Sequence, residues 1–484
     1  MDLLLKISNV YVEYAGREVL NIDELELYAH DRIGLVGGNG AGKSTLLKVL
    51  AGELSPAGCK IQRLGEAVYI PQLGEVDVNA TGDLAALSRM GLAGIALDTM
   101  SGGEETRAKI AAAMSAQAHA IFADEASSHL DPSGIRLLIQ QLKAFDGALV
   151  IVSHDRYFLD QIVDKIWELQ DGKISEYWGN YSQYRQQKDE ERKRGQDLYD
   201  QARLEMERLE KSAEEVRKQA KQKNKQKGVK HKVQKEGSQF GHQKQPGTKQ
   251  QRMHKTVENL ERRADALSEI APPSKQRQIT FHKNKALELH NKFPIVGDEI
   301  SLSFGERVIF DRAGFIIPLG AKVAFTGDNG TGKTTLLKMI YSRHPSLSIS
   351  PKAQMGYFDQ TPHKIATNQG IMEFLQSHSD YKQSEIRAVL AQIGFSSHDI
   401  KKPLTVLSGG EIIKLNLAKL LFGRHNILLL DEPSNYLDIA STEALEKMLK
   451  AHSATIIFIS HDKHLVNNVA DMTYLFSDGK ISEL

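Results

Sequence analysis

The sequence predicts an α/β protein made of two copies of one domain with a largely parallel sheet, joined by an antiparallel helical hairpin. Four sequence blocks occur twice in the same order. Short apolar runs alternate with helical patterns in each copy, as in α/β domains with a parallel sheet. Between the copies, apolar residues recur at spacings of three and four, which favours paired helices. We therefore expect domains over 1–184 and 289–484 and a hairpin linker over 185–288.

The repeated blocks define the two copies. The stretch "GLVGGNGAGKSTLLKVL" (34–50) returns as "AFTGDNGTGKTTLLKMI" (324–340). Three later blocks return as the pairs "MSGGEETR" and "LSGGEIIK", "FADEASSHLD" and "LLDEPSNYLD", and "IVSHD" and "FISHD". The offset is 290 residues in the first block and 307 in the others. The second copy therefore carries an insertion between its first two blocks.

Composition places the chain among soluble globular proteins. Its 484 residues exceed one ordinary core, and 41% of them are apolar. The single cysteine, Cys59, cannot form an internal disulfide, which favours a reducing compartment. The start "MDLLLKISNV" does not resemble an export signal, and no apolar run is long enough for a membrane helix. We expect a cytoplasmic protein that does not span a membrane.

Positive charge is concentrated between the copies. Residues 185–285 hold 27 Lys and Arg against 15 Asp and Glu, although the net charge of the whole chain is only +1. From 217 to 255 there are 13 basic residues and one acid, Glu236. Clustered cations displace counterions from phosphates, so a projecting basic hairpin is typical of a nucleic-acid probe. A solvated charged linker is the alternative.

The apolar spacing predicts unequal arms for this hairpin. The first helix is expected to span roughly 35 residues and the second about 22, ending before Pro272 and Pro273. Residues 222–250 are then expected to form an extended tip, in which glycines and Pro246 permit sharp turns. Phe240 is suited to stack on a base, with packing against its own hairpin as the alternative. The tip residues expected to contact RNA are Gln239, Phe240, Gly241, His242, Lys244 and Lys249.

The first block of each copy is a phosphate-binding motif. GxxxxGK[ST] occurs at 37–44 and 327–334, each time between an apolar run and a helical pattern. Glycines let backbone N–H groups point at phosphate oxygens, helped by the positive end of the following helix. Lys43 and Lys333 are predicted to reach the outer phosphates, and Ser44 and Thr334 to coordinate Mg²⁺. The other loop residues expected to bind ATP are Gly37, Asn39, Gly40, Gly42 and Thr45, with Gly327, Asn329, Gly330, Gly332 and Thr335.

Paired acids end a later apolar strand in each copy. Asp124 and Asp431 fit a metal-side role. Glu125 and Glu432 fit the group that positions and activates water for attack on a γ-phosphate. An exposed turn is the alternative for these acids, and recurrence beside the phosphate loops disfavours it.

A histidine follows a third apolar strand in each copy. His154 and His461 stand in the "SHD" blocks at matched positions. A lone histidine is more often structural, but this recurrence favours contact with the γ-phosphate from the side.

Together these blocks resemble the ATP-binding cassette superfamily. In that superfamily two cassettes close head to tail, and each ATP lies between the phosphate loop of one and the SGGE motif of the other. The resemblance implies that Ser101, Gly102 and Gly103 complete the second site, and that Ser408, Gly409 and Gly410 complete the first.

The same resemblance implies further contacts to the nucleotide. Gln72 and Gln360 match the glutamine that senses Mg²⁺ and γ-phosphate, and they join the metal-side residues of each copy. Tyr14 and Phe304 match the aromatic that stacks on adenine, with a core or surface aromatic as the alternative.

Two positions depart from the superfamily pattern. Ala126 stands where a proline is expected after Glu125, which predicts a looser turn. Tyr436 occupies the position that His129 fills in the first copy. Both glutamates remain, so we expect two hydrolytic sites, and their relative rates stay open.

A tandem cassette pair joined by a long basic hairpin resembles the ABC-F family of ribosome-associated ATPases. Only 28 residues separate Gln72 from Ser101, which leaves no room for the arm insertion of several housekeeping members, and "GKISEL" ends the chain without an extension. With "MSGGEETR", "GHQKQPGTKQ" and "ALELHNKFPI", these features resemble the Msr-type members, which protect the ribosome from macrolides and streptogramin B compounds.

The resemblance implies a partner and a cycle. A monomer whose cassettes pair within one chain binds ATP with Mg²⁺, closes, and docks on the bacterial 70S ribosome near the tRNA exit site. The linker tip then points toward the peptidyl-transferase centre, contacts 23S rRNA, displaces the P-site tRNA and perturbs the drug site. Hydrolysis releases the protein. Direct displacement of the drug and a relay through rRNA remain open, as does the drug spectrum.

Three other functions remain open at this point. A housekeeping ABC-F translation factor would act without drug. The fused ATPase of a membrane importer would need only a short join between cassettes, which the hairpin disfavours. A DNA-maintenance ATPase would carry its coil inside a cassette rather than between two.

Overall fold

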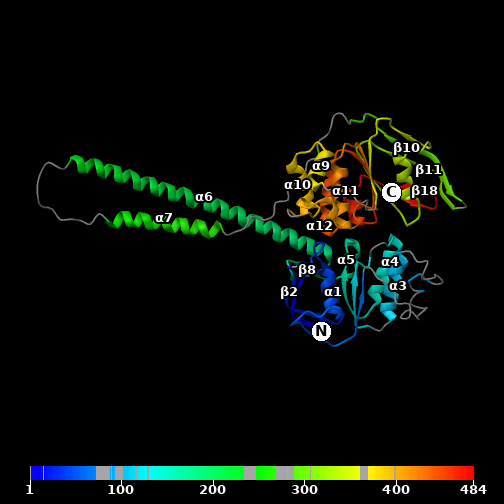
Figure 1. The fold of residues 1–484 in the computed structure, drawn as a ribbon, viewed down its shortest axis with the longest axis horizontal. Helices are drawn as coiled ribbons and strands as arrows, with labels where there is room; N and C mark the ends of the chain where they lie inside the picture. Colours follow the sequence, from blue (N-terminus) through cyan, green and yellow to red (C-terminus); the bar gives the residue numbers. More distant parts are fainter. Residues whose placement is uncertain are drawn as a thin grey trace. The chain divides into compact units, whose positions relative to one another are not determined.

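The computed structural model in Figure 1 describes most of the chain. The described residues are 2–14, 16–71, 88, 90–92, 102–115, 118–127, 130–233, 247–268, 281, 288–305, 307–359, 369–396, 399–435 and 437–484. Residues 1–184 and 277–484 form one compact unit, which holds both repeats, and residues 185–276 form another.

Each repeat contains a six-stranded sheet and a three-stranded antiparallel sheet. The larger sheet of the first repeat has, in spatial order, β5 (Ala67–Ile70), β6 (Ala120–Asp124), β7 (Ala148–Val152), β3 (Arg32–Val36), β8 (Lys165–Gln170) and β9 (Lys173–Trp178). The smaller one has β2 (Arg17–Tyr28), β1 (Leu3–Tyr14) and β4 (Lys60–Arg63). All pairs in the larger sheet are parallel except β8 with β9. The α/β fold with a largely parallel sheet is therefore confirmed.

The second repeat has the same strand order. Its larger sheet has β14 (Met355–Phe358), β15 (Ile427–Asp431), β16 (Thr455–Ile459), β12 (Lys322–Thr326), β17 (Met472–Ser477) and β18 (Lys480–Glu483). Its smaller sheet has β11 (Arg307–Ile317), β10 (Ile295–Phe304) and β13 (Leu347–Ile349). The corresponding sheets of the two repeats thus have the same strand order, as the sequence repeat predicts.

Both faces of the inner strands β6 and β7, and β15 and β16, are covered, which is why these strands are almost wholly apolar. In β6, Ala120 and Phe122 face one core with α1 and the small sheet, whereas Ile121 and Ala123 face a second core with the remaining helices. This alternation follows from the two-residue period of a strand. The helices among the described residues of the first repeat are α1 (Lys43–Ala51), α3 (Gly102–Ser115), α4 (Pro132–Ala144) and α5 (Arg156–Ile162).

The second repeat has described helices in the stretch where its insertion was expected. Between its phosphate loop and its SGGE block lie α9 (Ile371–Ser377), α10 (Gln383–Gln392) and the 3-10 turns η4 (Asp399–Lys401) and η5 (Leu404–Val406). The apolar faces of α9 and α10 pack with α11 in one core. The other helices that the structure describes in this repeat are α8 (Lys333–Tyr341), α11 (Gly409–Phe422), α12 (Ile439–Ala451) and α13 (Lys463–Val469).

The linker contains two antiparallel helices that lie side by side, α6 (Tyr181–Val233) and α7 (Gly247–Ser268) (Figure 1). Leu209 and Ala213 of α6 and Val257 and Ala264 of α7 are buried. An ion pair of 2.5 Å joins Arg217 of α6 to Glu261 of α7 across the hairpin.

The prediction of an extended tip over 222–250 is wrong at both of its ends. Helix α6 has 53 residues and continues through 222–233, and 247–250 form the first turn of α7. Residues 222–233 are rich in lysine and glutamine, contain no proline, and include a single glycine, Gly228. These residues are good helix formers, so the helix continues beyond the apolar stripe that predicted it.

None of the helices within the described residues combines the length and the hydrophobicity that a membrane crossing requires.

Candidate functional site

Each phosphate loop lies between a central strand of the large sheet and a helix, β3 and α1 in the first repeat and β12 and α8 in the second. In each loop the buried lysine folds back over the loop. Lys43 Nζ lies 2.8 and 3.1 Å from the carbonyl oxygens of Gly37 and Gly38, and Lys333 Nζ lies 2.7 Å from those of Gly327 and Asp328. Burial lowers the pKa of both lysines, and the adjacent acids oppose that effect.

Glycine is required at specific points of these loops. Gly327 has φ +132°, and a Cβ there would lie 2.4 Å from the carbonyl oxygen of Phe476. Gly332 has φ +96°, and a Cβ there would lie 2.5 Å from Ile309 Cγ2. Both positions combine a left-handed backbone with a neighbour that leaves no room for a side chain. The loop backbone is therefore held close to the strands that flank it.

The paired acids stand at the carboxyl ends of β6 and β15. Asp124 and Asp431 are the last residues of these strands and are buried. Thr334 Oγ1 donates to Asp431 Oδ1 at 3.2 Å, so these two predicted metal-side groups meet. In the first repeat, Tyr69 OH donates to Asp124 Oδ2 at 3.4 Å.

The glutamate that follows each aspartate has an unusual backbone. Glu125 and Glu432 adopt φ values of 57° and 49°, in the left-handed region that side chains rarely occupy. Their N–H groups donate to the carbonyl oxygens of Val152 and Ile459, at 2.9 and 3.1 Å. Non-glycine residues held in this conformation concentrate at functional sites.

Each glutamate is paired with the histidine of the SHD block. His154 Nε2 lies 3.0 Å from Glu125 Oε1, and His461 Nε2 lies 3.3 Å from Glu432 Oε1. Burial, and then the charge of the nearby lysine, lowers the pKa of both histidines to about 4. The imidazoles are therefore neutral near pH 7 and offer an N–H rather than a charge.

The second glutamate is held in an environment that opposes ionisation. Burial, and then the neighbouring Asp431 carboxylate, raises the pKa of Glu432 to about 7. Apart from the 3.3 Å contact with His461 Nε2, its Oε1 has no polar partner among the residues that the structure describes. A carboxyl group with a pKa near neutrality is suited to take up a proton at physiological pH.

Two aspartates that the sequence analysis did not assign join the repeats. Asp438 Oδ2 accepts from the backbone N–H of Asn39 at 3.1 Å, and Asp131 accepts from the backbone N–H of Asn329. Each aspartate also caps a helix of its own repeat, α12 or α4. The signal was present, because "LD" recurs at the 307-residue offset in both blocks.

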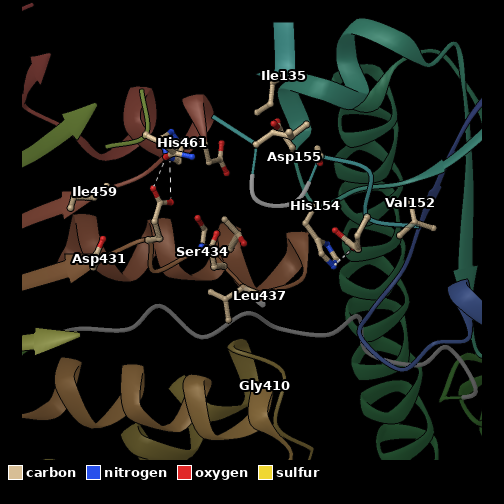
Figure 2. Close-up of a pocket in the computed structure, with 18 of the residues that line it drawn as sticks. Ile135, Val152, His154, Asp155, Gly410, Asp431, Ser434, Leu437, Ile459 and His461 are labelled. Atoms are coloured by element: carbon tan, nitrogen blue, oxygen red, sulfur yellow. Dashed lines mark hydrogen bonds and ion pairs between the residues drawn. The ribbon is translucent and has the colours of Figure 1, made fainter. Parts of the chain in front are cut away.

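Residues of both repeats line one cavity of about 1120 Å³ (Figure 2). Dashed lines in Figure 2 mark the contacts of His154 and His461. The predicted residues on its wall are Tyr14, Asn39, Gly40, Gly42, Lys43, Ser44, Thr45, Asp124, Glu125, His154, Phe304, Asn329, Gly330, Gly332, Lys333, Thr334, Thr335, Gly410, Asp431, Glu432 and His461.

Two exposed aromatic residues and one arginine also line the cavity. Tyr14 and Phe304 are exposed, at 53% and 61%, which suits a flat ligand better than a core role. Arg307, which sequence analysis missed, also lines the cavity and donates to the carbonyl oxygen of Gly330 at 2.9 Å.

The SGGE motif begins a helix in each repeat. Gly102 and Gly103 begin α3, and Gly409 and Gly410 begin α11. The Ser408 hydroxyl accepts from the Glu411 N–H at 3.3 Å and so caps α11.

Several predicted residues lie outside the described residues. They are Gln72, Ser101, Gln360, Gln239, Phe240, Gly241, His242 and Lys244, together with His129 and Tyr436. Lys249 lies in the first turn of α7. Ala126 is buried in the core of the first repeat, and the looser turn predicted from it stays a prediction.

Comparison with known proteins identifies the family. A family model described as "ABC transporter" matches residues 20–80 and 310–435, one stretch in each repeat. "Erythromycin resistance ATP-binding protein MsrA" of Staphylococcus epidermidis is 34% identical over 492 residues, which cover 99% of both chains. The chain belongs to the ABC-F family.

Other similar proteins agree with this ABC-F assignment. "Ribosome protection protein VmlR" of Bacillus subtilis (strain 168) is 30% identical over 100% of this chain and 88% of its own length. The solved structure of "RNase-L Inhibitor" superposes with a TM-score of 0.63 at 19% identity, covering 99% of this chain and 91% of that one. That likeness concerns the fold alone.

The ABC-F cassettes of this chain fit ATP with Mg²⁺, the nucleotide and metal that ATP-binding cassettes use in general, and the family supports ATPase activity. The glycine positions of the second loop leave no room for a side chain, as expected where backbone approaches phosphate. Thr334 and Asp431 present hard oxygen atoms close together, which suits Mg²⁺.

Proposed function

We propose that this ABC-F protein is a cytoplasmic ATPase that protects the bacterial 70S ribosome from macrolide and streptogramin B antibiotics. The observation that carries this proposal is the full-length similarity to an erythromycin resistance protein and to a ribosome protection protein. We keep the boundaries 1–184, 185–288 and 289–484 for the first cassette, the linker and the second cassette.

Hydrolysis takes place at two composite sites, ATP + H₂O → ADP + phosphate. Two observations support this: one cavity has walls from both repeats, and Asn39 and Asn329 donate to an aspartate of the opposite repeat. Ser408, Gly409 and Gly410 would complete the site of the first phosphate loop, and Ser101, Gly102 and Gly103 that of the second. The position of Gly410 on the cavity wall supports the first assignment.

Within each site, different side chains bind the nucleotide, hold the metal and activate water. Loop N–H groups and the lysine bind the phosphates, and the aromatic at the entrance stacks on adenine. Mg²⁺, held with Ser44 and Asp124 or Thr334 and Asp431, would neutralise phosphate charge. Gln72 and Gln360 would complete that set. Glu125 and Glu432 orient the attacking water and accept its proton, and the buried Oε1 of Glu432 is available for that bond.

The linker carries the effect to the ribosome. In the ATP-closed form the protein binds near the tRNA exit site, and the tip, including Phe240, extends toward the peptidyl-transferase centre. It displaces P-site tRNA and drug, and hydrolysis then releases the protein. The basic residues of 217–255 support contact with RNA phosphates. Docking can depend on ATP only because the closed form binds the ribosome better than the open form.

Acid is expected to slow the second site. In a Glu125→Gln variant, where only Glu432 serves as base, kcat/KM should fall about tenfold per pH unit below its midpoint, because a protonated carboxyl group cannot accept a proton. The midpoint is expected at about 7, the raised pKa of Glu432. His461 stays neutral over this range, since its pKa is about 4. Steady-state phosphate release between pH 5.5 and 8.5 measures the profile, and a flat profile down to pH 6 would contradict it.

Phe240→Ala is expected to abolish drug protection while ATP hydrolysis stays within about twofold of the parent, because stacking on a base is worth roughly 1 to 3 kcal/mol. The inhibitory concentration of erythromycin is measured in a susceptible bacterium that expresses each form. Phe293→Ala, a change of an exposed phenylalanine outside the linker, is the matched control. Unchanged protection would mean that the shape of the loop, rather than its aromatic ring, carries the effect.

Two related experiments separate this proposal from its alternatives. A housekeeping translation factor would change translation without drug and would leave every inhibitory concentration unchanged. The ATPase of an importer would fractionate with membranes, whereas the proposed protein should cosediment with ribosomes and leave them as salt rises.

A further inference from the structure

A buried arginine of the first repeat reaches into the second. Arg156 is the first residue of α5 and is 5% exposed. Its Nη2 lies 2.9 Å from Asp462 Oδ2 and also donates to Glu446 Oε1. Both carboxylates belong to the second repeat, and Glu446 is 7% exposed. Charged side chains are rarely buried unless paired, so this group requires contact between the repeats.

Asp462 divides its two oxygens between the repeats. Oδ2 takes the arginine, whereas Oδ1 accepts from the N–H groups of His464 (2.8 Å) and Leu465 (3.2 Å) and so caps α13. The N–H of Asp462 donates to Ser460 Oγ at 3.1 Å. Hydrogen bonds of both the backbone and the side chain of Asp462 therefore hold the chain directly after His461.

His461 is the residue that this anchor affects. Its Nε2 lies 3.3 Å from Glu432 Oε1 and 3.2 Å from Asn329 Oδ1, and its N–H donates to Glu432 Oε2 at 3.4 Å. A shift of the backbone at 461–462 would therefore move the imidazole away from both the glutamate and the phosphate loop.

The first site lacks this arrangement. At the 307-residue offset, Arg156 corresponds to Lys463 and Glu446 to Ile139. Lys463 Nζ lies 4.0 Å above the ring of Tyr157, and the side chain of isoleucine cannot accept a hydrogen bond. Asp155, the counterpart of Asp462, caps α5 through the Phe158 N–H at 3.0 Å. The contacts between the repeats therefore differ at the two sites: among the described residues, an arginine paired with two carboxylates lies beside the second site and not beside the first.

We propose that Arg156 is a positioning residue for the second nucleotide site, where it holds Asp462 and thereby sets His461 against Glu432 when the repeats are in contact. This inference rests on the proposed ATP hydrolysis at that site. Contact between the repeats then regulates the second site through an ion pair that the first site does not have.

Site-resolved kinetics test the proposal. Glu125→Gln leaves the second site active, and Glu432→Gln leaves the first. In the former, Arg156→Gln is expected to lower kcat for ATP at least about tenfold with KM changed less than about threefold, the mark of a group needed after binding. In the latter, the same change should alter kcat less than about twofold. Lys463→Gln, the matched control, should leave the second site active, and Arg156→Lys should restore part of its rate.

The other possible results of these measurements also test the proposed role of Arg156. Equal loss at both sites would indicate a merely structural role and overturn the proposal, as would no loss at the second site. If Arg156→Gln does not fold, as judged by circular dichroism, Arg156→Lys decides: it should lower kcat at the second site only. If neither single glutamate variant hydrolyses ATP before Arg156 is changed, the proposed two-site hydrolysis fails instead.

Discussion

Replacing Glu125 and Glu432 together with glutamine is expected to lower ATP turnover by about 10²- to 10⁴-fold, the usual contribution of a general base, while ATP still binds. The amide keeps the size of the carboxylate and an oxygen that faces the histidine, but it cannot accept the proton of water. Phosphate release and equilibrium binding of a fluorescent ATP analogue measure the two quantities.

The double variant should also stay on the ribosome. Since hydrolysis releases the protein in the proposed cycle, the variant is expected to cosediment with 70S ribosomes in ATP and not in ADP. Each single glutamine variant is the internal control and should retain turnover at one site. Parental turnover in the double variant would refute the assigned bases. Cryo-electron microscopy of the trapped complex would show what the linker tip touches.

Gly327→Ala is expected to weaken ATP binding at the second site by at least about tenfold, which corresponds to roughly 1.4 kcal/mol. A methyl group there would lie 2.4 Å from the carbonyl oxygen of Phe476, whose buried side chain fixes that backbone. The loop must therefore move, and its N–H groups would no longer point at the phosphates. The KM of the Glu125→Gln protein, where only the second site turns over, measures the effect.

Gly320→Ala is the matched control for this loop. Gly320 also has a left-handed backbone, with φ +79°, but nothing lies within 4 Å of a Cβ built on it. Its change should cost some stability and leave KM within about twofold, because strain alone, of order 1 kcal/mol, acts on folding. Equal KM values in both alanine variants would show that the close contact at Gly327 does not matter.

The sequence predicted the cassettes well because their chemistry is local. Each phosphate loop, strand-end acid and histidine lies in a short block whose strand or helix is marked by apolar pattern, and the repeat doubled every signal. The pairing of His461 with Glu432 follows from two strands that end at the same sheet edge.

Other features depended on contacts far apart in the chain. The asparagine–aspartate contacts between the repeats and the group around Arg156 arise only from their association, which no spacing along the sequence encodes. The length of α6 was misjudged for another reason: apolar periodicity marks where a helix packs, not where it ends. Lysine and glutamine continue a helix by propensity alone.

The left-handed backbone at Glu125 and Glu432 sets a limit on engineering this protein for heat resistance. Glycine or asparagine at these positions would relieve strain of order 1 kcal/mol or more at each, as such replacements do elsewhere. Both would also remove the carboxylate at the end of the sheet. A search that selects on melting temperature alone would therefore favour inactive proteins at these two positions, and it needs a parallel selection for turnover.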